Sequence, residues 1–152
     1  MMKKFFALMM VLSLGASAAM AEDFAQEKEK AIAALKVSMP EVVVDYAVRE
    51  RDDGRYEWDL FFEADDQLGV CEVREDSNEI RKVKLYEKAE GGLKASEAMA
   101  LLAQKKGDVV IVELDLDRDG KSLRYEGEAE LDGKRYEFEM SLSGEIIEWE
   151  RD

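Results

Sequence analysis

Apolar and polar positions follow a helical period near the start of the chain and a two-residue period over most of the rest. From about Asp23 to Met39, apolar side chains recur every three or four residues, and Pro40 is placed to end that helix. A two-residue alternation then sets in, most clearly over residues 56–63, where one face is apolar and the other mostly charged. The pattern predicts one helix followed by antiparallel strands at about 42–48, 56–63, 69–74 and 80–86.

The same order of elements recurs after a short Gly-containing linker at residues 90–92. A second helix is expected from Glu97 to Lys106, with Ser96 as its N-cap and Gly107 after its end. Three strongly alternating strands follow, and a last short strand covers residues 146–149. We expect these apolar residues to face one core: Val110, Val112, Leu114 and Leu116, then Tyr125, Gly127, Ala129 and Leu131, then Tyr136, Phe138, Met140 and Leu142.

The two halves also align in sequence, since residues 31–35 correspond to residues 98–102 and Pro40 to Gly107. A unit of about 60 residues is marginally stable alone, so we expect each unit to cover apolar surface of the other. The predicted fold class is α+β, with two tandem units at residues 22–89 and 93–152. Each unit is an N-terminal helix packed on a three- or four-stranded antiparallel sheet.

The first 21 residues have the pattern of a signal peptide. Lys3 and Lys4 precede an apolar run from Phe5 to Leu14, and Ala19-Met20-Ala21 forms a small-x-small cleavage site. The apolar run is too short to span a bilayer. We therefore expect residues 1–21 to be removed. The mature protein should lie in the periplasm or the medium, with no stable membrane insertion after cleavage.

The second half carries an ordered set of structural motifs. They are an Ala-rich helix at 98–102, Gly107, a Val-rich strand at 109–116, the Asp119-Gly120 turn, Tyr136-Glu137-Phe138-Glu139 and Gly144-Glu145-Ile146. This order resembles the PepSY domain, the module named for the propeptides of thermolysin-like metallopeptidases. The first half resembles it too, with Asn78 in place of the closing Gly. The resemblance implies cystatin-like units, no catalytic residues, and a role in peptidase regulation or protein binding outside the cytoplasm.

Composition narrows the possible chemistry. The chain has 36 acidic and 22 basic residues, a formal net charge of −14 and no His. A negative field of this size repels phosphate backbones, so nucleic acid is a poor partner. Without His and with only Cys71, His-based triads and the usual zinc and copper sites are excluded, and we expect no enzyme. Cys71 lies among apolar strand residues and is predicted to be a buried thiol, with an intermolecular disulfide as the alternative.

Nine acids are predicted to share the outward face of the second sheet: Glu113, Asp115, Asp117, Glu126, Glu128, Glu130, Asp132, Glu137 and Glu139. Like charges opposite each other on neighbouring strands are destabilising, so this face is either solvated or a docking surface for a basic protein. Phe61 points to the charged side of the first sheet and is a further candidate contact. The candidate partner-binding set is Glu113, Glu126, Glu128, Glu130, Glu137, Glu139 and Phe61.

Residues 115–120 with Glu126 match the D-x-D-x-D-G-x₅-E calcium-loop pattern. An EF-hand needs a helix on each side of this loop, whereas both flanks here alternate as strands do. An ordinary hairpin is favoured. The alternative is a weak calcium site formed by Asp115, Asp117, Asp119 and Glu126, and no other cofactor is expected.

Taken with the resemblance, these features predict a non-enzymatic protein-binding module. Its expected partner is another exported protein, which it would inhibit or modulate, most plausibly a peptidase or related hydrolase. The alternative function is that of an acidic cation-binding or calcium-sensing protein.

Overall fold

The computed structural model describes residues 14–88, 92–120 and 122–152, with side chains from Phe24 onward. The predicted signal peptide (residues 1–21) and most of the linker lie outside the residues or side chains described. The first helix, α2 (Leu14–Ser38), begins nine residues before the predicted Asp23. Its backbone runs through the Ala-rich stretch 16–21, whose composition favours helix rather than ending it.

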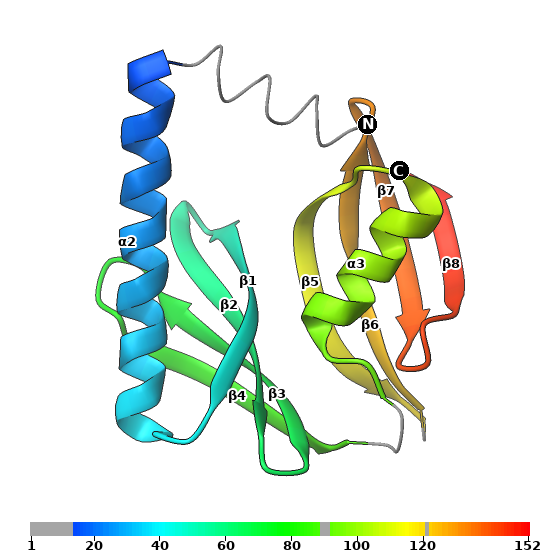
Figure 1. The fold of residues 1–152 in the computed structure, drawn as a ribbon, viewed down its shortest axis with the longest axis horizontal. Coiled ribbons are helices and arrows are strands. Elements are labelled where there is room, and N and C mark those ends of the chain that lie inside the picture. The colour runs from blue at the N-terminus through cyan, green and yellow to red at the C-terminus, as the bar shows by residue number, and fades with distance from the viewer. Residues whose placement is uncertain (1–13, 89–91, 121) are drawn as a thin grey trace.

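The first unit consists of α2 and a four-stranded antiparallel sheet (Figure 1). The strands are β1 (Val43–Asp52), β2 (Arg55–Ala64), β3 (Gln67–Arg74) and β4 (Ile80–Glu87). They are joined in sequence order, so the sheet order is β1-β2-β3-β4. Tight turns at Asp53-Gly54 and Asp65-Asp66 connect the first three, with Asp53, Gly54 and Asp65 in the left-handed backbone region typical of such hairpins.

The second unit repeats this arrangement with α3 (Ala95–Lys106) and a second four-stranded antiparallel sheet. Its strands are β5 (Val110–Asp119), β6 (Ser122–Leu131), β7 (Lys134–Ser141) and β8 (Ile146–Arg151). Strands β5, β6 and β7 each begin 67 residues after β1, β2 and β3. The chain is therefore an α+β protein of two tandem units, as the alternation predicts.

One face of the first sheet packs against α2. Trp58, Leu60 and Phe62 of β2 are buried there with Ala31 and Leu35 of the helix, as their alternation predicts. Tyr56, at the start of the same row, is 39% exposed. Cys71 and Val73 of β3 complete this core.

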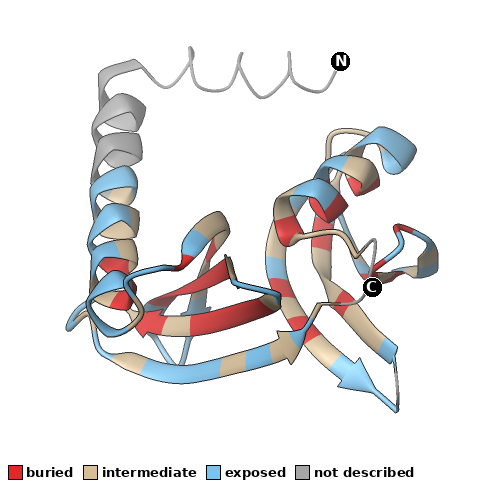
Figure 2. Ribbon diagram, turned by 60° about the horizontal axis from the view of Figure 1, so that its bottom comes forward, coloured by how far each residue is buried: buried red, intermediate tan, exposed pale blue. Residues whose placement is uncertain are grey.

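The opposite face of the first sheet packs against the second unit. Val48, Phe61, Leu68 and Val70 belong to one buried cluster with apolar residues of α3, β5, β6 and β7. Strands β1 and β5 lie side by side in this junction, and buried positions face each other across it (Figures 1 and 2). Each unit thus covers apolar surface of the other, which is the arrangement expected for units of this size.

A β-bulge changes which residues of β5 face the core. Ile111 pairs with Ala129 and Glu113 with Glu128, so Val112 is an extra residue between the two pairs. The prediction that Val110 and Val112 point inward with Leu114 is therefore wrong. Val110 is 49% exposed, while Ile111 packs against the core in its place. Strand β1 has the corresponding bulge, with Asp45 as the extra residue.

The start of α3 also differs from the prediction. The helix begins at Ala95 with Lys94 as its N-cap residue, and Glu97 accepts a hydrogen bond of 3.1 Å from the Lys94 backbone N–H. Ser96 lies inside the first turn, where its own N–H needs an acceptor. Asp45 of the β1 bulge supplies that acceptor at 2.8 Å, so the cap comes from the other unit.

Candidate functional site

The face of the second sheet that points away from α3 carries two cross-strand rows of acids. One row is Glu113, Glu128, Glu137 and Glu150, and the other is Asp115, Glu126, Glu139 and Glu148. Each residue lies directly opposite the next on the neighbouring strand, about 4.8 Å away in the sheet. We call these eight residues the acidic face. Six of them come from the predicted nine, and Glu148 and Glu150 were not predicted.

Only part of this charge is neutralised within the described chain. Arg135 pairs with Glu128 at 3.1 Å, Arg124 with Glu139 at 3.5 Å, and Lys84 of the first unit with Asp115 at 2.8 Å. Arg135 also reaches Glu130, which lies beside the rows on β6. Among the described residues, no ion pair involves these five: Glu113, Glu126, Glu137, Glu148 and Glu150.

Three of these acids, Glu113, Glu126 and Glu148, have raised pKa values, with burial as the largest cause in each. Burial, followed by hydrogen bonding and repulsion from Glu128, raises the pKa of Glu113. Burial and then repulsion from Glu139 raise the pKa of Glu126, while burial and then Glu150 raise that of Glu148. A raised carboxyl pKa means that the ionised form is disfavoured where it stands. A cation placed on this face would relieve that cost.

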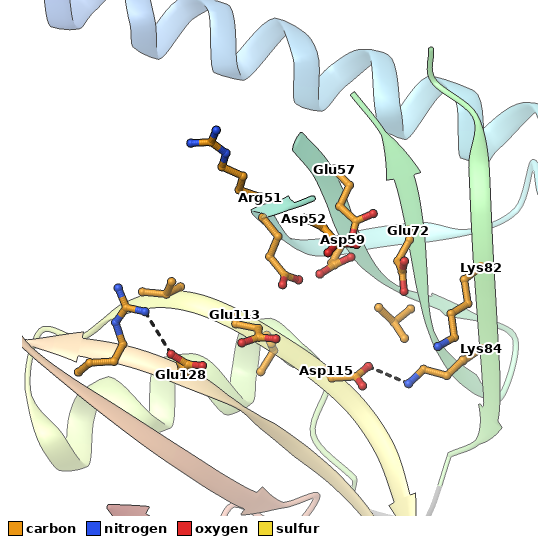
Figure 3. A pocket seen from close by; sticks show the side chains of 15 residues that line it. Arg51, Asp52, Glu57, Asp59, Glu72, Lys82, Lys84, Glu113, Asp115 and Glu128 are labelled. Carbon is orange, nitrogen blue, oxygen red and sulfur yellow. Dashed lines mark hydrogen bonds and ion pairs between the residues drawn. The ribbon is translucent and has the colours of Figure 1, made fainter. Parts of the chain in front are cut away.

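A groove of about 540 Å³ continues from the acidic face into the space between the two sheets. In Figure 3, strands of the first unit line one wall and β5 and its neighbours line the other. Glu113 and Asp115 point into it from the second unit, and Lys82 and Lys84 from β4. The lining is mostly charged, with Val70, Val112 and Leu114 as its apolar members.

Three carboxylates converge on the first-unit wall of this groove. Glu50 of β1 lies directly opposite Glu57 of β2, and Asp59 follows two residues later on the same face. One oxygen from each lies within 4.8 Å of the others. Glu57 and Asp59 are buried, and burial together with repulsion from Glu113 and Glu57 raises the pKa of Glu50 to about 8.

This triad was not predicted from the sequence. Glu57 and Asp59 alternate with the apolar row of β2, so they read as an ordinary solvent-facing side. The second unit forms the opposite wall of the groove that they line, and no local pattern reveals which part of a sheet another unit will face. The like-charge pair Glu50 and Glu57, opposite each other across the Asp53-Gly54 hairpin, was the available signal.

The residues of the candidate calcium loop lie along a strand and do not surround a single point. Asp115, Asp117 and Asp119 alternate on β5, so successive acids are about 6.8 Å apart, and Glu126 lies opposite Asp115. Asp115 accepts from Lys84 and from the Leu116 N–H. Asp117 accepts from the Arg118 N–H at 2.9 Å and from the Tyr86 hydroxyl at 3.4 Å. The motif forms the end of a hairpin, and its acids bind neighbours within the chain.

Phe61 is not available as an exposed contact residue. It is 1% exposed and packs edge-on against Tyr46, with ring centroids 6.3 Å apart, inside the core shared by the two units. The face to which it points is charged only in part, and its apolar part is covered by the second unit. The remaining candidate residues, Glu113, Glu126, Glu128, Glu130, Glu137 and Glu139, all lie on one face of the second sheet.

Comparisons with known proteins give no family assignment. No protein-family profile matches the chain, and no curated protein matches it. One solved structure, that of a "putative lipoprotein" from Clostridium difficile 630, aligns with 80% of this chain and 90% of its own. The sequence identity is 14% and the TM-score 0.45, values too low to support a functional conclusion.

Within residues 14–88, 92–120 and 122–152, no helix is both long enough and apolar enough to cross a bilayer.

Proposed function

We propose that this protein is an exported, non-catalytic binding module that holds a basic segment of another protein on its acidic face. One observation carries the proposal: two complete cross-strand rows of four acids occupy a single sheet face. Rows of like charge weaken a sheet, so a face of this kind is explained by a ligand that neutralises it. Five of the eight acids have no ion-pair partner in the described chain, which leaves them free for such a ligand.

The spacing on the acidic face favours an extended basic segment. Glu148 and Glu150, two of the acids without an ion-pair partner in the described chain, alternate along β8 and are about 6.8 Å apart, which is also the separation of alternate side chains in an extended peptide. A segment with Lys or Arg at alternate positions could therefore place one cation over each glutamate. Electrostatic complementarity of this kind sets the association rate and the salt dependence of binding.

The resemblance to PepSY domains supplies the class of partner. Such modules are expected to be tandem cystatin-like units that modulate an extracytoplasmic peptidase or a related hydrolase by occlusion. The order of one helix and four antiparallel strands in each unit supports this reading. Export rests on the signal-peptide pattern of residues 1–21, and the absence of a catalytic role rests on the lack of His and of an activated nucleophile.

The proposal is tested with a synthetic peptide that has lysine at alternate positions and a matched peptide with glutamine in their place. Binding to the mature protein should require the lysines and weaken as salt is added. The triple variant Glu126→Gln/Glu137→Gln/Glu148→Gln should bind the peptide about tenfold more weakly, a difference of about 1.4 kcal/mol.

A second triple variant controls for net charge. Glu41→Gln/Glu79→Gln/Glu87→Gln removes the same three charges from exposed positions off the acidic face. Peptide affinity should change little in this variant. An equal loss of affinity in both would mean that only net charge attracts the peptide, and the acidic face would be ruled out as the site.

The partner class is tested separately with purified exported peptidases that carry basic surface segments. Inhibition by the mature protein should be relieved in the first triple variant and retained in the control variant. Inhibition that is unchanged in both would place the contact elsewhere on the molecule.

A further inference from the structure

Asp59 is a buried carboxylate with an unused acceptor. Its residue is 5% exposed, and within the described part of the chain its Oδ1 has no hydrogen-bond partner. Removing a charge from water is unfavourable unless a partner compensates for the lost hydration. Its side chain points into the groove between the two sheets, beside Glu57 (Figure 3). Something that binds carboxylate oxygens is expected at this point.

The neighbouring carboxylates increase the unfavourable free energy of burying Asp59. Glu50 and Glu57 each bring a carboxylate oxygen within 4.8 Å of an Asp59 oxygen, and among the described residues none of the three forms an ion pair. The cations that line the groove are engaged or placed elsewhere. Lys84 binds Asp115, and Arg135 binds Glu128 and Glu130. Lys82 lies opposite Glu72 on the neighbouring strand, and the Arg51 guanidinium lies over the Tyr56 ring, 5.8 Å from its centroid.

We propose that Glu50, Glu57 and Asp59 bind a divalent hard cation, with Ca²⁺ as the ion that fits best. Ca²⁺ takes oxygen ligands at 2.3–2.6 Å, so two ligands on opposite sides of one ion are up to about 5 Å apart. Three oxygens within 4.8 Å of one another can therefore reach the same ion. The donor set is made only of carboxylates, which disfavours zinc and copper, and Cys71 lies in the core on the other face of the sheet.

The groove can supply the rest of the coordination shell. It is open to solvent and about 540 Å³ in volume, so water can complete the six to eight ligands that Ca²⁺ requires. The ion would lie where β1 and β2 face the second unit, with Glu113 and Asp115 on the opposite wall. This site is distinct from the peptide site proposed on the acidic face, and it needs no partner protein.

The test uses calorimetric titration of Ca²⁺ into the chelator-treated protein, together with thermal melts in calcium and in chelator. We expect one ion per chain, with a dissociation constant of about 10⁻⁴–10⁻³ M, as in extracellular calcium modules. The melting temperature should rise with calcium, because the ion binds only the folded state. No binding of Ca²⁺ up to about 10 mM would overturn the proposal.

Variants locate the ion. Asp59→Asn should weaken calcium binding at least tenfold. Glu50→Gln should weaken it to the same extent, and because Glu50 is only half-buried this variant can be used if Asp59→Asn fails to fold. Asp59→Asn should raise the melting temperature in chelator, because it removes an uncompensated buried charge, whereas Glu50→Gln should change it less, since the raised pKa of Glu50 already disfavours its ionised form at neutral pH. A purely structural role of Asp59 would give the opposite sign in chelator, and that result would overturn the proposal.

The matched control is a variant in the hairpin that matches the calcium-loop pattern. Asp117→Asn/Asp119→Asn alters the hairpin that matches the calcium-loop pattern but leaves the triad intact. Calcium binding should persist in this variant. Loss of binding there, with binding retained in Asp59→Asn, would move the ion to the hairpin and overturn the assignment to the triad. Because calcium is the only ligand in these titrations, failure here leaves the peptide experiments unaffected.

Discussion

The carboxylate of Asp45 accepts a hydrogen bond of 2.8 Å from the backbone N–H of Ser96, fifty-one residues further along the chain. Asp45 is the extra residue of the β1 bulge, and Ser96 lies in the first turn of α3. The N–H groups of a first helical turn have no partner within the helix, and an acid there also interacts favourably with the helix dipole. A local irregularity in one unit thus stabilises the helix of the other.

Removing this cap should weaken the whole protein. Asp45→Ala is expected to lower the free energy of unfolding by about 1–2 kcal/mol, because it leaves an N–H of α3 without its acceptor. Asp45→Asn should cost less, since its amide oxygen can still accept and burial already raises the pKa of Asp45 against its charged form. Denaturant unfolding measures both. Asp66→Ala, at an exposed hairpin position, is the control, and an equal loss there would contradict the capping role.

The core shared by the two units predicts that they unfold together. Trp58 reports on the first unit, and Trp149, which stacks on Tyr136 at 4.6 Å, reports on the second. In variants that keep one tryptophan each, Trp58→Phe and Trp149→Phe, denaturant transitions followed by fluorescence should coincide. Residues 93–152 expressed alone should melt less cooperatively than the whole chain. Separate midpoints, or a fragment as cooperative as the parent, would show two independent cores.

Phe61 is the residue through which this coupling should be strongest. Phe61→Ala removes a fully buried ring from the shared core, and the expected loss is about 3–5 kcal/mol in the free energy of unfolding. Phe62→Ala removes an equally buried ring from the core beneath α2 and should cost a similar amount. Only the first substitution should separate the Trp58 and Trp149 transitions. If both substitutions leave them coincident, Phe61 does not link the units.

Local patterns were enough to predict some features and not others. The strand over residues 56–63 follows from alternation and from the Asp53-Gly54 turn, both of which act between near neighbours. The bulge at Val112 was not predicted. One extra residue exchanges the faces to which the preceding side chains point, but the sequence still alternates on either side of it. The burial of Phe61 depends on how the second unit docks, as does the groove that Asp59 lines. Alternation shows which residues share a face, but it does not show what covers that face.

The ion pair between Arg49 and Glu75 in the first unit should be sensitive even to a conservative substitution of Arg49. The Arg49 guanidinium donates to both oxygens of Glu75, at 2.7 and 2.8 Å, and Trp58 Nε1 donates to Glu75 at 3.0 Å. Arg49 also stacks on Tyr56, 3.6 Å from the ring centroid. Lysine can reproduce neither the paired hydrogen bonds nor the stacking. Arg49→Lys is therefore expected to cost about 1–2 kcal/mol in unfolding free energy, measured with denaturant, and no loss would contradict this account.

The same ion pair gives a pH dependence with a definite sign. Hydrogen bonding from Arg49 lowers the pKa of Glu75 below its ordinary value of 4.5. A carboxyl group whose folded pKa is lowered stabilises the protein above its unfolded pKa, and this stabilisation disappears as the pH falls through the folded pKa. The difference in unfolding free energy between the wild type and Glu75→Gln should therefore be largest near neutral pH and shrink below about pH 4.5. A difference that grows in acid would contradict the assignment.

Cys71 should be chemically inert in the folded protein. Its side chain is fully buried beneath α2, and burial raises the pKa of the thiol to about 11. At neutral pH a rise of about two pKa units reduces the thiolate fraction about a hundredfold, and exclusion of the reagent slows the reaction further. Reaction with a thiol-specific reagent should therefore be negligible in buffer and complete in guanidinium chloride.

In the variant Cys71→Ser/Val83→Cys, the thiol moves to the directly opposite but exposed position on β4 and should react rapidly in buffer. Rapid labelling of the wild type, or a disulfide-linked dimer that resists dilution, would instead favour pairing between chains.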